Sequence, residues 1–168
     1  MSWSLYAMPL HHLARDGGWE WAASAGAVRG LPDQPPEPTP PARVGDVLDA
    51  VRAAGCHGTA WFEVDGVAAG SELPGCPDAG TCVVEQGPDL GEVSLHAAGQ
   101  VRHGQPLSID AAAAGMSFRK PNTLAVLRAV CALTSVAGPL LVHDDSANGV
   151  FVVWPGQRAE DLRGEWPW

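Results

Sequence analysis

Two groups of residues have side chains that could carry chemistry if the fold brought them together. The first joins Cys56-His57 to Cys76 and Cys82. Zinc sites gather three or four thiolate or imidazole ligands, and paired cysteines commonly stand two to four residues apart. Five residues separate Cys76 from Cys82, and no second close pair follows. The sequence therefore predicts no metal site and no cofactor. Cys56 and Cys131 are expected to be small buried side chains, and pairing of Cys76 with Cys82 stays open.

The second group is His143 followed by Asp144 and Asp145. An imidazole beside carboxylates can act as a general base. The run Asp-Asp-Ser-Ala-Asn-Gly is also typical of a hairpin turn in which Asn148 and Gly149 take positive φ. We favour the turn. The catalytic interpretation of the three residues remains as an alternative, a small enzyme of bacterial specialised metabolism with a cleft between sheet and helices.

Composition limits the classes of function. The chain has 168 residues, of which 46% are hydrophobic, and this is enough for one domain with a buried core. Its net charge of -9 disfavours nucleic-acid binding. No apolar run is long enough to span a membrane, and no secretory signal is visible at the N-terminus. Abundant Gly, Pro, Ala and Arg indicate a GC-rich bacterial genome, and we expect a cytoplasmic protein.

Negative charge is concentrated in one segment. Residues 58–118 contain eight acidic side chains and a single basic one, Arg102. These acids either keep the protein soluble or form a docking surface for a cationic protein. Tryptophan is enriched at binding surfaces, and Trp19 and Trp21 lie in a flexible context, whereas Trp61 and Trp154 are expected in the core. The candidate partner-binding residues are Glu63, Asp65, Glu72, Glu85, Glu92, Trp19 and Trp21.

Hydrophobic periodicity predicts an α+β domain over residues 1–168. A Pro-rich loop at 31–41 and an irregular Gly/Pro loop at 70–80 interrupt it. The expected strands are 2–10, 59–64, 67–69, 81–85, 92–97, 140–143 and 150–154, and the expected helices are 46–54, 124–133 and a short one near 158–162. Asp65-Gly66 indicates a hairpin, and 106–118 suits either a helix or a strand. Runs of strands without regular alternation with helices favour an antiparallel sheet of about five to seven strands, with two main helices on one face.

The C-terminal third resembles the SitI3-like group of bacterial immunity proteins, which accompany polymorphic toxins. The resemblance rests on Met116-Ser-Phe-Arg-Lys120, the apolar helix through Leu133, Gly138-Pro-Leu-Leu-Val142 and Gly149-Val-Phe-Val-Val153. It implies a non-enzymatic cytoplasmic inhibitor that occludes a toxin. We therefore expect an acidic protein that binds a basic protein partner, with the small enzyme as the alternative.

Overall fold

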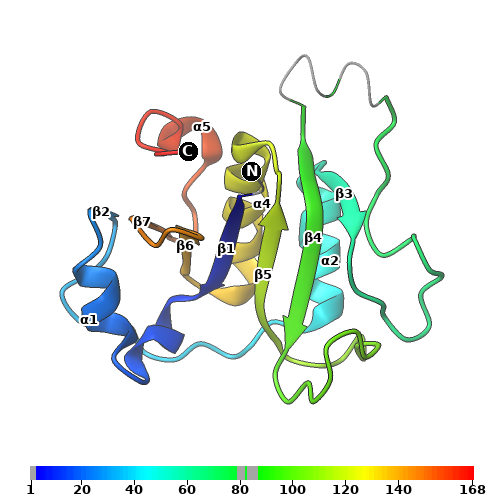
Figure 1. Cartoon of the computed structure of the whole chain (residues 1–168), viewed down its shortest axis with the longest axis horizontal. Helices are drawn as coiled ribbons and strands as arrows, with labels where there is room; N and C mark the ends of the chain where they lie inside the picture. Colours follow the sequence, from blue (N-terminus) through cyan, green and yellow to red (C-terminus); the bar gives the residue numbers. More distant parts are fainter. Residues whose placement is uncertain (1–2, 79–81, 83–86) are drawn as a thin grey trace.

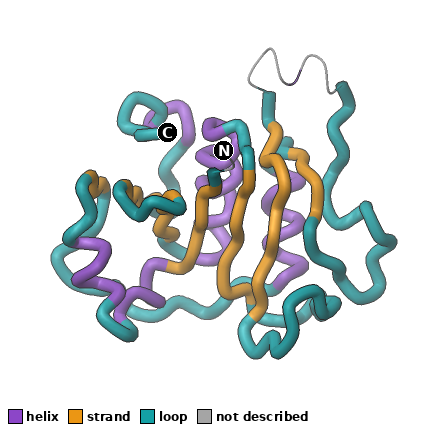
Figure 2. Tube along the Cα trace, in the orientation of Figure 1, coloured by secondary structure: helices purple, strands orange, loops and turns teal. Residues whose placement is uncertain are grey.

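The described residues form an α+β fold around one seven-stranded mixed sheet. This computed structural model describes residues 3–78, 82 and 87–168. The strand order is β2-β7-β6-β1-β5-β4-β3, and Figures 1 and 2 show the central strands side by side with helices behind them. The strands are β1 (Ser4–Pro9), β2 (Ala27–Arg29), β3 (His57–Ala60), β4 (Asp89–Ala97), β5 (Ala113–Arg119), β6 (Leu140–Asp144) and β7 (Gly149–Val153).

Two helices, α2 (Val44–Ala53) and α4 (Thr123–Ala137), cover one face of the sheet. Apolar residues occupy most of the circumference of α4. A helix with so wide an apolar face is largely buried. Both helices pack against inward-facing strand residues such as Leu5, Val93 and Phe118 in the main core. This packing fixes the beginning of α4 beside the beginning of β4, where the Asn122 backbone N–H donates to the Asp89 carbonyl (2.9 Å).

A second apolar cluster lies on the opposite face, at the β6–β7 end. Side chains alternate along a strand, so Leu140 and Val142 join the main core while Leu141 joins this cluster. The 3-10 helix η1 (Leu10–Ala14) and helix α1 (Gly18–Ala23) cover it. The last helix, α5 (Ala159–Leu162), leads the chain end back into the main core.

Several predicted elements are confirmed. The Pro-rich stretch 31–41 is a loop, and residues 70–78 of the predicted irregular loop are irregular. Helix α2 begins two residues before the predicted start, α4 begins after Asn122 as its cap, and β6 and β7 form the predicted hairpin. The ambiguous segment 106–118 contributes strand β5. The predicted strand 81–85 lies outside the described residues, apart from Cys82.

The prediction of an antiparallel sheet is wrong at both edges. β2 pairs with β7 in parallel, and β3 pairs with β4 in parallel. The predicted hairpin at Asp65-Gly66 is also wrong, because Val64 forms an isolated parallel bridge with Leu107 and no strand returns along 67–69. Local turn signals act over four residues, whereas the choice of a strand's partner depends on distant packing.

Two further predictions need correction. Trp61 is 56% exposed, because β3 ends at Ala60 and the chain leaves the sheet at its open edge. In the β6–β7 turn the positive φ (55°) belongs to Ala147 and not to Asn148 or Gly149.

Candidate functional site

The parallel pairing of β3 and β4 places a histidine beside a carboxylate. His57 is the first residue of β3, Asp89 is the first residue of β4, and the two are paired in register. The imidazole is 5% exposed. Its Nδ1 lies 3.7 Å from an Asp89 carboxylate oxygen, beyond hydrogen-bond length, and Nδ1 has no hydrogen-bond partner among the described residues.

The other imidazole nitrogen faces two cysteines. His57 Nε2 lies 3.1 Å from Cys82 Sγ. One ligand atom each from His57, Cys76 and Cys82 lies within 4.8 Å of the other two. We call these three residues the Cys2His cluster. Cys82 is buried and Cys76 is exposed, and both are free thiols. The cluster therefore has one protected side and one side open to solvent.

Main-chain hydrogen bonds hold the long β3–β4 connection against the start of β3. The Gly58 N–H donates to the Pro74 carbonyl (3.1 Å), and the His57 N–H donates to the Pro88 carbonyl (3.0 Å). The Cys82 carbonyl accepts from the Gly87 N–H (2.9 Å). These bonds bring the two cysteines to the histidine although about twenty residues separate them in the chain.

The surroundings of the Cys82 sulfur favour a cation. Burial raises the pKa of the Cys82 thiol, and so do Cys76 and the carboxylates of Asp89 and Asp78. A raised pKa opposes a standing thiolate, which a cysteine nucleophile needs. The same negative neighbours attract a metal ion, and a bound metal ion deprotonates a coordinating thiol. The carboxylates near the Cys82 sulfur thus suit a bound cation.

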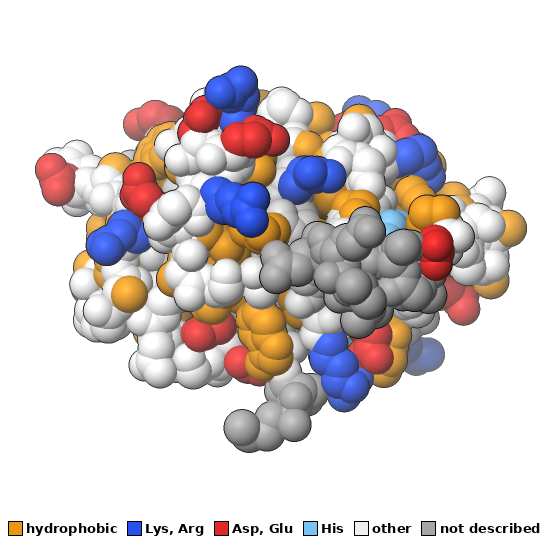
Figure 3. Space-filling model, turned by 90° about the horizontal axis from the view of Figure 1, so that it is seen from above, with side chains coloured by type: hydrophobic (Ala, Val, Ile, Leu, Met, Phe, Trp, Pro, Cys, Tyr) orange, Lys and Arg blue, Asp and Glu red, His pale blue; other side chains and the backbone are white. Residues whose placement is uncertain are grey.

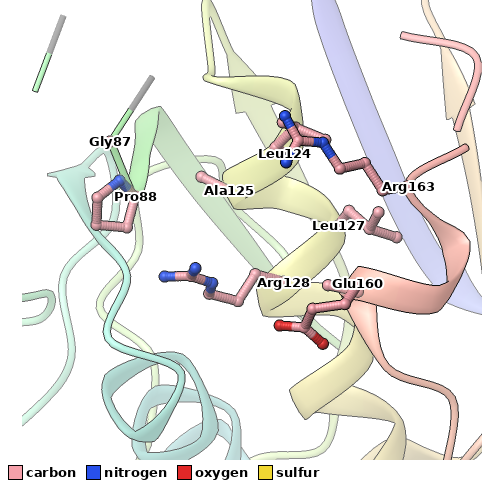
Figure 4. A pocket seen from close by; sticks show the side chains of 9 residues that line it. Gly87, Pro88, Leu124, Ala125, Leu127, Arg128, Glu160 and Arg163 are labelled. Atoms are coloured by element: carbon pink, nitrogen blue, oxygen red, sulfur yellow. The ribbon is translucent and has the colours of Figure 1, made fainter. Parts of the chain in front are cut away.

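A cavity of about 530 Å³ opens beside the cluster. Its wall includes His57, Cys76 and Cys82 together with Asp78 and Arg52. A neighbouring cavity of about 310 Å³ lies between Gly87-Pro88 and helices α4 and α5 (Figure 4). In Figure 4 the side chains of Arg128 from α4, Glu160 from α5 and Arg163, the residue after α5, extend along that second cavity.

His143, Asp144 and Asp145 are neighbours whose polar groups point to separate partners. His143 Nδ1 lies 2.8 Å from the Asp144 carbonyl oxygen and not from a carboxylate. One Asp144 carboxylate oxygen accepts from the Asn148 N–H (3.3 Å), and the Asp145 carboxylate accepts from the Ser4 N–H (3.1 Å). The carboxylates are thus engaged in the turn and in the N-terminal strand.

The structure disperses the predicted partner-binding residues. Trp19 and Trp21 pack half-buried on the second apolar cluster, beside the β6–β7 end of the sheet. Glu72 is 2% exposed, because the chain turns inward at the adjacent core residue Leu73, and so it offers no surface carboxylate. Glu92 forms an ion pair with Arg119.

Two acids of the predicted set, Glu63 and Asp65, are exposed, and Glu85 lies outside the described residues. On the face shown in Figure 3, acidic and basic side chains are interspersed. Acidic side chains therefore do not form one continuous patch on that face.

We compared the chain with protein families, curated proteins and solved structures. No family model, no curated protein and no solved structure matches the chain. Within the described part of the chain, no helix combines the length and apolar character needed to cross a bilayer.

The spacing of Cys56-His57, Cys76 and Cys82 predicts no metal site, whereas the fold brings His57, Cys76 and Cys82 together. The spacing rule for zinc sites assumes that the ligands come in close pairs along the chain. A usable signal is the long stretch 61–78, which is rich in Gly and Pro, since long irregular connections in compact domains are commonly functional.

Proposed function

We propose that this protein binds a zinc ion through His57 Nε2 and the sulfur atoms of Cys76 and Cys82. The observation that carries the proposal is that one imidazole nitrogen of His57 and both sulfur atoms lie within 4.8 Å of one another, with Nε2 3.1 Å from the Cys82 sulfur. Ligand atoms around tetrahedral zinc lie about 3.5–3.8 Å apart, given Zn–S and Zn–N bonds of about 2.3 and 2.0 Å. Small side-chain movements therefore suffice to seat the ion, and thiolate with imidazole is a donor set that zinc prefers.

Asp89 supports this proposal as a positioning residue. Ligating histidines commonly donate their second ring N–H to a carboxylate, which fixes the tautomer and the ring orientation. His57 Nδ1 lies on the side of Asp89, 3.7 Å from its oxygen, while Nε2 faces Cys82. Closing this gap by about 1 Å would make that hydrogen bond.

The ion would stabilise the connection between β3 and β4. Parallel strands need a long crossover, which is usually a helix. Here the described stretch 61–78 contains no helix and no named strand. A metal ion that links Cys76 and Cys82 to the first residue of β3 would hold the end of this stretch against the sheet. Three protein ligands also leave the fourth zinc position toward the cavity, for a water, a carboxylate or an added ligand.

A cobalt titration of the reduced full-length chain tests the proposal. Tetrahedral sulfur and nitrogen ligands give Co²⁺ intense visible bands and a thiolate charge-transfer band, and zinc should abolish both by displacement. We expect Cys82→Ser and His57→Ala each to weaken zinc binding at least about tenfold, and Asp89→Asn to weaken it by roughly tenfold.

The matched control is Cys131→Ser, which removes a thiol from helix α4 outside the cluster and should leave zinc affinity unchanged. Zinc at a hundred times its dissociation constant should raise the free energy of unfolding by about 2.7 kcal/mol, whereas magnesium should not. Equal zinc affinities for the wild-type chain and the Cys76→Ser/Cys82→Ser double variant would refute the site.

A separate observation favours a second function, binding of a basic protein partner at the β3 edge. Residues 61–65 alternate, with Trp61, Glu63 and Asp65 exposed while Phe62 and Val64 face inward. An exposed tryptophan followed by two exposed carboxylates suits a cationic protein surface. This feature supports the inhibitor that the resemblance to immunity proteins implies, and we propose these three residues as its contact.

Co-purification with the product of the neighbouring gene tests this second function. Trp61→Ala should weaken the complex at every ionic strength. Glu63→Gln/Asp65→Asn should weaken it most at low salt, because salt screens exposed charges. Asp33→Asn/Glu37→Gln makes the same charge change in the exposed Pro-rich loop and should have no effect. Failure of the wild-type chain to co-elute at low salt would contradict the proposal.

A further inference from the structure

Cys76 and Cys82 lie close enough to form a disulfide bond as well as to bind one metal ion. Their sulfur atoms lie within 4.8 Å of each other, and neither is bonded to another cysteine. A disulfide bond is about 2.05 Å long, so the two sulfur atoms have to approach by at most about 2.8 Å. Cys76 lies in an irregular stretch and is exposed, so a change of its side-chain torsion together with a small main-chain movement can supply this approach.

The other two cysteines are placed elsewhere. The Cys56 S–H donates to the Ala125 carbonyl (3.6 Å) and packs in the main core. Cys131 belongs to α4 and packs against that core. Neither belongs to the Cys2His cluster. The structure thus distinguishes one pair of thiols from the two remaining thiols.

We propose that Cys76 and Cys82 form a reversible disulfide bond on reaction with a peroxide, and that this bond and a bound zinc ion exclude each other. The second half of this inference rests on the proposed zinc function, whereas the disulfide itself does not. The thiolates coordinate zinc, but the sulfur atoms of a disulfide are poor ligands. Oxidation therefore removes two of the three protein ligands at once and leaves His57 alone.

The reaction balances with hydrogen peroxide as the oxidant. The Cys76 sulfur attacks one peroxide oxygen and the O–O bond breaks, which gives a sulfenic acid and hydroxide. The Cys82 sulfur then attacks the Cys76 sulfur, the S–O bond breaks, and the second hydroxide leaves. Two protons convert the hydroxides to water and Zn²⁺ is released. The two sulfur atoms lose two electrons in total, and the peroxide gains them.

The experiment treats the zinc-loaded full-length chain with hydrogen peroxide and follows released zinc with a chromogenic chelator. We expect one zinc ion per chain to be released, a loss of two hydrogen masses, and a Cys76–Cys82 linkage in the peptide map. Dithiothreitol should restore zinc binding. Cys131→Ser should behave as the wild type, and Cys76→Ser should lose the linkage.

Other results would overturn the inference. These are a linkage that involves Cys56 or Cys131, oxidation of Cys76 to sulfinic acid without a linkage, or a disulfide form that keeps its zinc. If the reduced chain binds no zinc, the zinc proposal and the exclusion fail together. The peptide map of the peroxide-treated apo chain then decides the disulfide by itself.

Discussion

At the scale of single residues, the four cysteines differ in burial and therefore in reactivity. Burial and the nearby Glu160 carboxylate raise the pKa of Cys131 to about 11. Burial also raises the pKa of Cys56 to about 11, although the Arg128 guanidinium acts in the opposite direction. Cys76 is exposed. Thiol chemistry should therefore begin at Cys76, on the open side of the Cys2His cluster.

Alkylation of the metal-free reduced chain checks this order. At pH 8, a thiol with a pKa near 11 is about 0.1% thiolate, so Cys131 should react with iodoacetamide at least tenfold more slowly than Cys76. A raised pKa means that the rate at Cys131 rises with pH up to about 11. Peptide mass spectrometry over time gives both rates, and equal rates at pH 8 would contradict the burial of Cys131.

Two glycines with positive φ allow the cost of backbone strain to be measured apart from the cost of a steric clash. Gly91 in β4 has φ +68°, and an added Cβ would meet the carbonyl oxygens of Arg119 and Lys120. Gly55 has φ +71°, but nothing lies within 4 Å of such a Cβ. Gly55→Ala should cost about 1–2 kcal/mol from the left-handed conformation alone. Gly91→Ala should lower the free energy of unfolding, measured by urea denaturation, clearly more than Gly55→Ala does. Equal losses for the two variants would show that β4 and β5 can move apart at Gly91.

At the scale of elements, the beginning of α4 joins the helix to the candidate site. The Asn122 side-chain oxygen accepts from the Leu124 N–H (3.1 Å) and caps the helix. Its amide nitrogen donates to the Gly87 carbonyl (2.8 Å), and the Gly87 N–H in turn donates to the Cys82 carbonyl. One side chain thus links the stability of α4 to the position of Cys82, a proposed zinc ligand.

Two variants of Asn122 should separate these roles. Asn122→Ala removes the cap and should lower the free energy of unfolding by about 1 kcal/mol or somewhat more. Asn122→Asp keeps the oxygen acceptor at the helix N-terminus but removes the donor to Gly87, so the loss of stability should be smaller. Both should weaken zinc binding, because both lose the bond to Gly87. Unchanged zinc affinity in both would show that this bond does not position Cys82.

At the scale of the whole molecule, the end of the chain completes the core. Trp166 is 7% exposed, and its ring meets those of Phe151 (5.1 Å between centroids) and Trp168 (4.8 Å) edge to face. The Trp168 carbonyl accepts from the Thr123 hydroxyl (2.9 Å), which ties the C-terminus to the start of α4. The terminal tryptophans therefore contribute to stability.

A buried and an exposed tryptophan should differ in their contribution to the free energy of unfolding. Trp166→Ala should destabilise the fold by about 3–5 kcal/mol, as expected for a large buried side chain. Trp61→Ala removes an exposed ring with Arg119 5.8 Å from its centroid and should cost below about 1 kcal/mol. Urea denaturation measures both. A small loss for Trp166→Ala would mean that the C-terminal segment is not part of the cooperative unit.

The sequence by itself determined the elements whose signals are local. Proline excludes the stretch 31–41 from regular structure, a wide apolar face defines α4, and two short apolar runs on either side of a turn sequence define β6 and β7. Each of these depends on residues within a few positions of one another. Only the tertiary structure decided which strand lies beside β3. The Thr59–Val64 pattern with Asp65-Gly66 favoured a hairpin, but β3 pairs in parallel with β4, which comes from beyond a long connection. That neighbour is what places Asp89 beside His57 and folds both cysteines over them. Strand pairing is a non-local choice made by the packing of the whole core, so no local spacing rule could have found the site.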